Sequence, residues 1–175
     1  MTGSFEVNSV EETWDLARKF AEVLKPGDVV CLEGDLGAGK TTFTQGLAAA
    51  MGVSGRVTSP TFCIVQEHLG ADRLLVHMDL YRLHGEDDVE AIGWEDYLAR
   101  GAIMVVEWPE RAGALIPDSA YHITFRYREG EENRTVTIDG GLTADALNFS
   151  SFFSFNSSEI LMRRKCFNSR IPRRA

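Results

Sequence analysis

The part of the sequence most informative about the fold is the stretch Gly34-Asp35-Leu36-Gly37-Ala38-Gly39-Lys40-Thr41. It matches the pattern G-x-x-x-x-G-K-[ST] at every fixed position. Glycines in such a loop let the backbone turn tightly and point its N–H groups at phosphate oxygens. The lysine of the pattern reaches the β- and γ-phosphates of a nucleotide, and the hydroxyl that follows binds Mg²⁺. The alternative interpretation is a glycine-rich turn without a ligand.

The residues around this loop support the phosphate-binding interpretation. A short apolar run at 29–32 predicts a strand buried on both faces before the loop. A helical stretch from about Thr41 to Met51, closed by Gly52, follows the loop and places a positive helix end at the phosphates. Strand, loop and helix in this order are the context in which the pattern binds nucleotides.

An earlier helix is predicted by a capping-box pattern at Ser9 and Glu12, and it stops at Pro26-Gly27. Apolar residues then recur at three- and four-residue steps, which predicts one buried stripe. The stripe consists of Val10, Trp14, Ala17, Ala21 and Leu24. We therefore expect Trp14 to belong to the core.

The rest of the chain alternates between strand-like and helix-like segments. Strands are predicted at 62–66, 74–79 and 102–106, a helical segment at 86–100, and a hairpin from 121–127 and 134–138 around Glu129-Gly130. Alternation of this kind predicts an α/β fold with a mainly parallel sheet. We predict a P-loop NTPase-like three-layer fold with an antiparallel C-terminal hairpin.

Two carboxylates stand where parallel strands end. Asp79 ends the strand at 74–79, and Glu107 follows the strand at 102–106. The phosphate loop leaves the carboxyl end of its own strand, so a parallel sheet brings all three to one edge. We predict that Asp79, Glu107 and Lys40 are catalytic, and that Asp79 and Glu107 join Thr41 as metal ligands. Solvated strand ends are the alternative for each carboxylate.

A loop stiffened by Pro60 carries two hydroxyls, Ser59 and Thr61, one helix after the phosphate loop. Hydroxyls placed there can sense a γ-phosphate as a switch loop does, or they can belong to an ordinary turn. His77 shares a strand face with Asp79 and is either a working or a structural histidine.

Two side chains beyond the strand ends also leave alternatives open. Arg82 supplies charge to a transition state or forms a surface ion pair. Trp108 shields the site or packs in the core.

Composition divides the chain near Asp139-Gly140-Gly141. The net charge is −8 over 175 residues, but residues 1–140 carry −12 and residues 141–175 carry +4. We predict a domain at 1–140 and a basic, Phe/Ser-rich tail at 141–175, which is either a disordered extension or a docking or nucleic-acid arm. The acidic domain argues against an indiscriminate nucleic-acid binder, because phosphate attraction needs basic surface.

Cysteine usage and hydropathy indicate the compartment. Three widely spaced cysteines with no CxxC pattern support neither a disulfide framework nor a zinc site. The sequence contains no run of 18 apolar residues, so no membrane span is predicted. The N-terminus lacks a secretory signal pattern. We expect reduced thiols and a cytoplasmic protein without membrane contact.

Four motifs resemble the TsaE family, also called YjeE, in their residues, order and spacing. They are Gly34-Asp35-Leu36-Gly37-Ala38-Gly39-Lys40-Thr41-Thr42-Phe43, Ser59-Pro60-Thr61-Phe62, His77-Met78-Asp79-Leu80-Tyr81-Arg82 and Val106-Glu107-Trp108-Pro109-Glu110. The resemblance covers about residues 5–140. Many proteins share the first motif, but few combine it with HxDLYR and EWPE. The basic tail departs from the family pattern, since the family normally ends soon after the hairpin.

The resemblance implies the bacterial ATPase that is needed to make threonylcarbamoyladenosine in tRNA. It implies binding of ATP or ADP with Mg²⁺ by residues 34–42, with Thr41 and Glu107 serving the metal. It also implies that the segment from Ser9 to Thr13 lies near the adenine and that Arg134 approaches the nucleotide. TsaD and TsaB are the implied partners, and tRNA is met only through their complex.

The resulting hypothesis is an ATP-hydrolysing component of the machinery that modifies adenosine 37 of tRNAs. We expect its switch or partner-facing surface to include Ser59, Thr61, Tyr81, Arg82 and Trp108. A small P-loop kinase is one alternative, although no Arg-rich lid follows the sheet. A non-catalytic nucleotide-sensing adaptor is the other.

Overall fold

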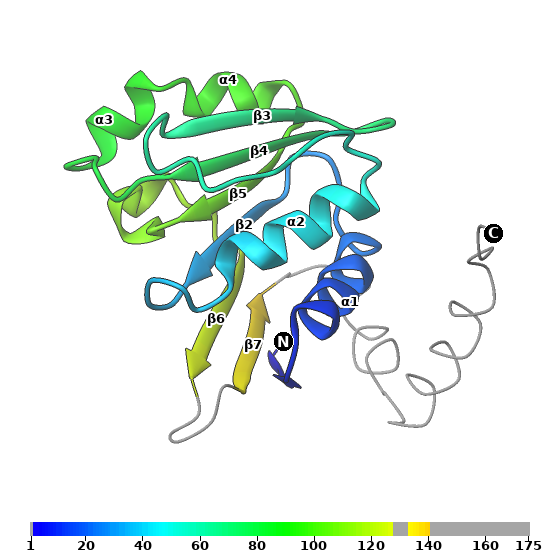
Figure 1. The fold of residues 1–175 in the computed structure, drawn as a ribbon. Helices are drawn as coiled ribbons and strands as arrows, with labels where there is room; N and C mark the ends of the chain where they lie inside the picture. Colours follow the sequence, from blue (N-terminus) through cyan, green and yellow to red (C-terminus); the bar gives the residue numbers. More distant parts are fainter. Residues whose placement is uncertain (1, 128–132, 141–175) are drawn as a thin grey trace. The chain divides into compact units, whose positions relative to one another are not determined.

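A seven-stranded mixed sheet is the centre of the described part of the chain, residues 2–127 and 133–140 of the computed structural model (Figure 1). The strands are β1 (Thr2–Val7), β2 (Val29–Glu33), β3 (Val65–Leu69), β4 (Leu74–Asp79), β5 (Ile103–Glu107), β6 (Tyr121–Tyr127) and β7 (Arg134–Gly140). Their order is β1-β7-β6-β2-β5-β4-β3. The central strands β6, β2, β5 and β4 are parallel, and β1, β7 and β3 pair antiparallel.

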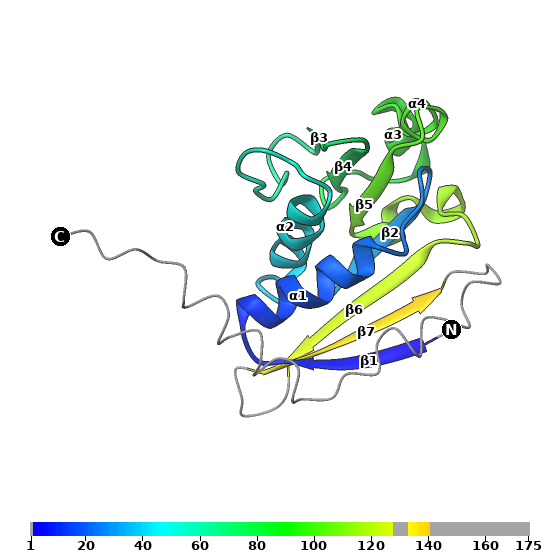
Figure 2. The same cartoon turned by 90° about the vertical axis from the view of Figure 1, so that its right-hand side faces the viewer.

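Helices cover both faces of this sheet and make three layers (Figure 2). On one face lie α1 (Val10–Ala21) and α2 (Lys40–Ala50). The other face carries α3 (Glu86–Ala91), α4 (Trp94–Ala99) and the 3₁₀ turns Pro109–Arg111 and Gly113–Leu115. The predicted three-layer α/β class and the antiparallel hairpin, formed by β6 and β7, are therefore confirmed.

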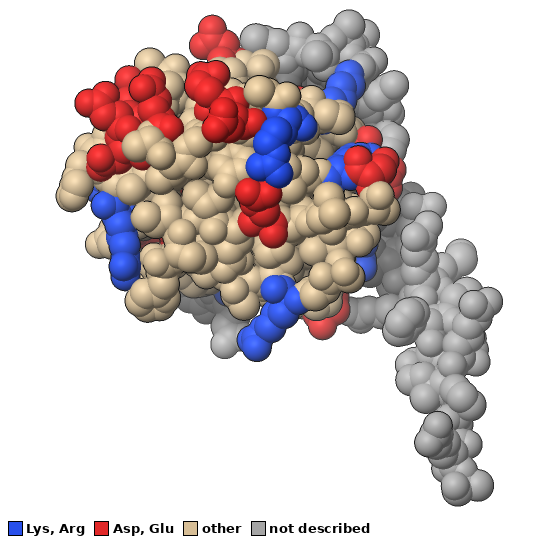
Figure 3. Space-filling model, turned by 90° about the horizontal axis from the view of Figure 1, so that it is seen from above, with Lys and Arg blue, Asp and Glu red and all other residues tan. Residues whose placement is uncertain are grey.

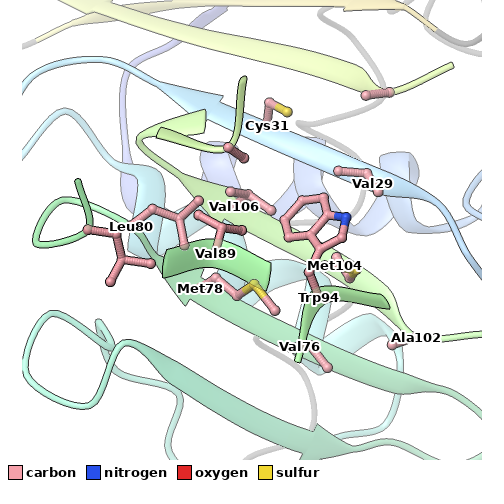
Figure 4. Close-up of a cluster of buried hydrophobic side chains, with 13 residues drawn as sticks. Val29, Cys31, Val76, Met78, Leu80, Val89, Trp94, Ala102, Met104 and Val106 are labelled. Carbon is pink, nitrogen blue, oxygen red and sulfur yellow. The ribbon is translucent and has the colours of Figure 1, made fainter. Parts of the chain in front are cut away.

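The core beneath α3 and α4 is a buried hydrophobic cluster (Figure 4). Residues of β2, β4 and β5 that face α3 and α4 pack there against Val89 of α3 and Trp94 of α4, both fully buried. The labelled strand residues are Val29, Cys31, Val76, Met78, Met104 and Val106. Successive residues of each strand face this cluster and the opposite layer in turn. Because both faces are buried, these strands are apolar throughout, as was predicted for residues 29–32.

Aromatic rings fill the opposite layer, between the sheet and the pair α1 and α2. Phe20 of α1 contacts Phe43 of α2 with ring centroids 5.9 Å apart, and Phe43 contacts Phe125 of β6 at 5.7 Å. This packing fixes α2 over the sheet. The phosphate loop is thereby held between β2 and α2 as a link between two buried elements.

Gly46 lets α1 and α2 approach closely. A Cβ at Gly46 would lie 2.7 Å from Cβ of Ala17 and 3.0 Å from Cα of Trp14, closer than real contacts allow. We expect Gly46→Ala to destabilise the protein by about 1–3 kcal/mol through overpacking, which exceeds the ~1 kcal/mol gained in helix propensity. Thermal unfolding measures this loss. At Gly85 a Cβ meets no atom within 4 Å, so Gly85→Ala is the control with a smaller effect.

The stripe predicted from Val10 to Leu24 is confirmed at Ala17, Ala21 and Leu24 and wrong at Val10 and Trp14. Val10 and Trp14 are 47% and 37% exposed, and the expectation that Trp14 belongs to the core is corrected. The buried positions are Thr13, Leu16, Ala17, Phe20 and Ala21. Phe20, and not Trp14, is the aromatic residue of α1 that is buried against the sheet, where its ring contacts Tyr121 of β6. The N-cap prediction is confirmed, since the Ser9 hydroxyl accepts from the N–H of Glu12 at 3.1 Å.

Two strands differ from the prediction. β1 was not predicted, and it pairs antiparallel with β7 at the edge of the sheet. The strand predicted at 62–66 lies at Val65–Leu69 and is an antiparallel edge strand. The stretch before it instead forms turns, with Ile64 at φ 66°.

Several expectations concern residues outside the described ranges. The tail at 141–175, with Cys166, and the turn at Glu129-Gly130 lie outside them, so the domain boundary stays a prediction. Cys31 and Cys63 are free cysteines, and burial raises the pKa of the Cys31 thiol to about 12. In the described part of the chain, none of the helices has the length and apolar character needed to cross a membrane.

Acidic side chains gather over α3 and α4 on the face seen in Figure 3. They include Glu86, Asp87 and Glu90 of α3 and Glu95 and Asp96 of α4. This face repels a phosphate backbone, in agreement with the argument from net charge.

Candidate nucleotide site at the phosphate loop

The phosphate loop joins β2 to α2 in a conformation that requires glycine. Gly34 and Gly39 have φ of 138° and 112°. A Cβ at Gly34 would also lie 2.6 Å from the carbonyl oxygen of Phe125, so both space and backbone angle exclude a side chain there. Gly39 is the residue before α2, so the first N–H groups of the helix are directed at the loop. This geometry is the cradle that the sequence pattern predicts.

Lys40 is held in place by contacts within the protein. Its ammonium donates to the carbonyls of Gly34 at 2.7 Å and Asp35 at 3.1 Å. It also lies 3.8 Å from Oε2 of Glu107, and both side chains are almost fully buried. The lysine therefore spans the mouth of the loop, at the position where a phosphate group would meet it.

Glu107 and Asp79 end neighbouring strands, as predicted. They are register partners in the parallel pair β4–β5. Glu107 Oε1 lies 2.9 Å from Nε2 of His77, which is fully buried. The structure thus brings Lys40, Glu107 and His77 together in one buried chain of contacts. The Nδ1 atom of His77 has no hydrogen-bond partner among the described residues.

Asp79 connects the strand end to the predicted switch loop. Its Oδ2 accepts from the Thr61 hydroxyl at 2.7 Å, and the Thr61 and Ser59 hydroxyls are also 2.7 Å apart. Its Oδ1 accepts from the N–H of Tyr81 at 3.1 Å. The loop that carries Ser59 and Thr61 is therefore tied to the same sheet edge as the phosphate loop.

Trp108 and Tyr81 pack beside Lys40. Their ring centroids are 5.0 Å apart, and the Lys40 ammonium lies 5.8 Å from the centroid of the Trp108 ring. Trp108 is partly buried, so it is both a wall of the site and a contact of the core cluster. The Arg82 guanidinium lies 5.0 Å from the centroid of the exposed Phe62 ring, and among the described residues it forms no ion pair. Its role at a transition state stays a prediction.

Arg134 and Tyr127 lie against the other side of the loop. Cδ of Arg134 would be 3.8 Å from a Cβ at Gly39, and its guanidinium lies 5.1 Å from the Tyr127 ring centroid. The Tyr127 hydroxyl donates to the carbonyl of Gly37 at 2.7 Å. Tyr127 was not predicted from the sequence, because only the pairing of β6 with β2 brings it to the loop. The buried Nε of Arg134 has no partner among the described residues.

Ser9 and Thr13 make local contacts at the start of α1. Ser9 caps the helix, and the Thr13 hydroxyl donates to the Ser9 carbonyl at 3.0 Å. Among the described residues, no hydrogen bond joins Ser9 or Thr13 to the phosphate loop. Their expected position near an adenine stays a prediction.

A cavity of about 690 Å³ opens next to Lys40. Trp108 and Glu110 line it from the segment after β5, and His122 lines it from β6. Glu33 also lines it and lies 3.0 Å from Nδ1 of His122 through Oε1. The pair Glu33–His122 and Glu110 as a lining residue were not predicted from the sequence.

The oxygen donors at the site suit Mg²⁺. Thr41 follows Lys40 in α2, and Asp79 and Glu107 present carboxylates at the same edge. Over residues 2–127 and 133–140, no three His, Cys, Asp or Glu side chains form a ready-made metal cluster. A magnesium ion bound mainly through phosphates and water needs only one or two protein oxygens, so these residues fit it.

The sheet order, the glycine-dependent loop and the positioned lysine define a P-loop NTPase-like α/β protein. Residues 7–136 match the family model described as threonylcarbamoyl adenosine biosynthesis protein TsaE. The chain belongs to the TsaE family, which is a family of threonylcarbamoyladenosine biosynthesis. The resemblance drawn from the four motifs is thereby confirmed.

Relatives span most of the chain. The tRNA threonylcarbamoyladenosine biosynthesis protein TsaE of Bacillus subtilis is 42% identical over 128 residues, covering 73% of this chain and 79% of that protein. The protein of the same name from Streptomyces coelicolor is 41% identical over 72% of this chain and 88% of its own. The crystal structure of Bacillus subtilis YdiB superposes with a TM-score of 0.72 at 31% identity, covering 87% of this chain and 94% of that one.

Proposed function

We propose that this protein binds ATP or ADP with Mg²⁺ and hydrolyses ATP to drive the complex that threonylcarbamoylates adenosine 37 of tRNA. The observation that carries the proposal is Lys40, held by two loop carbonyls next to the buried Glu107–His77 pair. A lysine with a purely structural role would not need to lie where the phosphate loop meets the strand ends. The names of the relatives support the same pathway.

The proposal gives each predicted site residue a role. Lys40 and the N–H groups of residues 34–42 would bind the phosphates, and Arg134 would approach them from the Gly39 side. Thr41, with Asp79 and Glu107, would hold Mg²⁺, which neutralises phosphate charge. Glu107 would orient the attacking water and accept its proton. Thr61, bonded to Asp79, would respond to the nucleotide, and Ser9 and Thr13 would lie near the adenine.

His77 is expected to position Glu107. His77→Leu leaves a buried Glu107 oxygen without its partner, so we expect a stability loss of about 1–3 kcal/mol. We also expect ATP turnover to fall at least tenfold, with little change in ADP affinity. His77→Gln can place an amide nitrogen near the Nε2 position and should restore most of the turnover. Calorimetry, thermal unfolding and phosphate release separate these effects, and equal turnover in all three proteins would contradict the role.

The implied partners are TsaD and TsaB. The chain offers a phosphate loop and a switch-like loop, and such an ATPase is expected to be slow until a partner orders its site. The surface expected at the contact includes Ser59, Thr61, Tyr81, Arg82 and Trp108, which flank the loop.

Coupling between ATP and the partner complex tests the whole proposal. We expect TsaB–TsaD to bind this protein at least fivefold more tightly with ATP, and ATP to bind more tightly by the same factor with the complex present. Titrations in both directions, together with phosphate release alone and with the complex, measure this. Phosphate transfer to an added small acceptor would favour a kinase. Binding without turnover in any mixture would favour an adaptor.

A further inference from the structure

The Tyr127 hydroxyl reaches the phosphate loop from the end of β6. It donates to the carbonyl of Gly37 at 2.7 Å, and a Cβ placed on Gly37 would lie 3.4 Å from the same hydroxyl oxygen. Among the described residues, Tyr127 provides the only side-chain hydrogen bond to residues 34–39 that comes from outside the loop and α2. This contact therefore links the middle of the loop to the sheet.

The hydrogen bond fixes the peptide unit between Gly37 and Ala38. The unit is planar and trans, so its carbonyl and its N–H point in opposite directions. Tyr127 binds the carbonyl, and the N–H of Ala38 donates to the carbonyl of Asp35 at 3.1 Å. Gly37 has φ of 78°, close to the value that a type II turn has at its third residue. The turn at 35–38 is therefore held at both ends of this peptide, directly before the N–H groups of residues 39–41.

The ring of Tyr127 makes a second contact, with Arg134. The two residues are register partners in the β6–β7 pair, and the Arg134 guanidinium lies 5.1 Å from the ring centroid. Nε of Arg134 would lie 3.9 Å from a Cβ at Gly39, so the arginine runs along the loop. That Nε is buried and has no hydrogen-bond partner in the part of the chain that the structure describes. One tyrosine thus contacts both the turn of the loop and the arginine beside it.

Folding alone does not account for the Tyr127 hydrogen bond. Tyr127 is 47% exposed, and an exposed hydroxyl can bond to water. Its hydrogen bond within the protein therefore adds little to the free energy of unfolding. A glycine-rich loop, by contrast, loses much backbone freedom when it closes around phosphates. Contacts that order such a loop in the free protein increase its affinity for the ligand.

We propose that Tyr127 is a positioning residue that orders the phosphate loop for the phosphate groups of a nucleotide. Its hydroxyl sets the direction of the Gly37–Ala38 peptide, and its ring keeps Arg134 on the Gly39 side of the loop. The loop cradles the phosphates that ADP and ATP share, so Tyr127 affects the binding of both nucleotides alike and not the reaction step. The effect on nucleotide affinity rests on the proposed function, whereas the ordering of the loop does not.

Amide hydrogen exchange in the nucleotide-free full chain, followed by NMR, tests the ordering of the loop. Tyr127→Phe removes the hydroxyl and keeps the ring. We expect the N–H of Ala38 to exchange about 3- to 10-fold faster, the factor that corresponds to one neutral hydrogen bond. Tyr97→Phe is the matched control, because the Tyr97 hydroxyl of α4 donates to Glu67 at 3.1 Å, and it should leave the exchange of Ala38 unchanged. Equal exchange of Ala38 in the unsubstituted protein and in Tyr127→Phe would overturn the proposal.

Nucleotide binding and turnover test the consequence for the site. Tyr127→Phe is expected to weaken the binding of ADP and ATP by the same factor, about 3- to 10-fold, while kcat at saturating ATP changes less than about twofold. Tyr127→Leu also removes the ring that Arg134 contacts, and should weaken both affinities further. Calorimetry and phosphate release measure these quantities. A fall in kcat at unchanged affinity in Tyr127→Phe would refute the positioning role.

The two experiments separate this proposal from the proposed function. If the unsubstituted protein binds neither ADP nor ATP, the proposed function fails, and the exchange of Ala38 still decides whether Tyr127 orders the loop. If exchange is faster in Tyr127→Phe but both affinities are unchanged, the ordering does not serve nucleotide binding and the proposal fails.

Discussion

Replacing Glu107 by glutamine is expected to reduce ATP hydrolysis by roughly two to three orders of magnitude, which is the usual size of the loss of a general base or its equivalent. Glutamine keeps the shape of the side chain but cannot accept a proton from water or supply full charge to Mg²⁺. Glu107 is buried between Lys40 and His77, so no solvent group can replace it. ADP affinity is expected to change by less than about fivefold, because a group acting mainly in the transition state affects turnover more than binding.

Single-turnover phosphate release and calorimetry with ADP measure the two quantities. Glu90→Gln, on the exposed surface of α3, is the matched control and should retain full activity. Equal losses of hydrolysis and ADP binding would assign Glu107 to the structure of the site and not to the reaction. Asp79→Asn is expected to act in the same direction, although Asp79 also holds Thr61 and the N–H of Tyr81.

Replacing Lys40 by alanine is expected to weaken ATP binding by ~1–3 kcal/mol, or roughly 5- to 150-fold. The ammonium is the cation that would face the β- and γ-phosphates, and charge-assisted contacts are the stronger class of hydrogen bond. The loop carbonyls of Gly34 and Asp35 also lose their donor. The backbone N–H groups of the loop remain, so binding should weaken and not vanish.

Calorimetry with ATP and with ADP checks this result, and circular dichroism checks that the fold is intact. Arg100→Ala removes an exposed cation that pairs with Glu67 of β3 and is the control for a general effect of charge. Unchanged ATP affinity in Lys40→Ala would contradict the assignment of the phosphate cradle.

Local sequence was enough to predict which residues gather at the candidate site. A pattern of glycines followed by Lys40 and Thr41 needs only neighbouring residues to form its cradle, so local sequence predicts it. Asp79 and Glu107 were predicted to meet because parallel strands end at one edge, and their register confirms this. The buried strands β2, β4 and β5 were also predicted, since continuous apolar runs have few other uses in a short domain.

Contacts that depend on strand register and on helix rotation became known from the tertiary structure alone. The buried face of α1 was predicted at Ala17 and Ala21, but Phe20 and not Trp14 is its buried aromatic residue, because both suit a core equally well in sequence. β1 is a strand because it pairs with β7. Tyr127 and His122 reach the loop and the cavity because β6 lies beside β2. Such contacts join residues that are distant in the chain. Their energies depend on which helices and strands pack together, and a local sequence pattern carries no information about that packing.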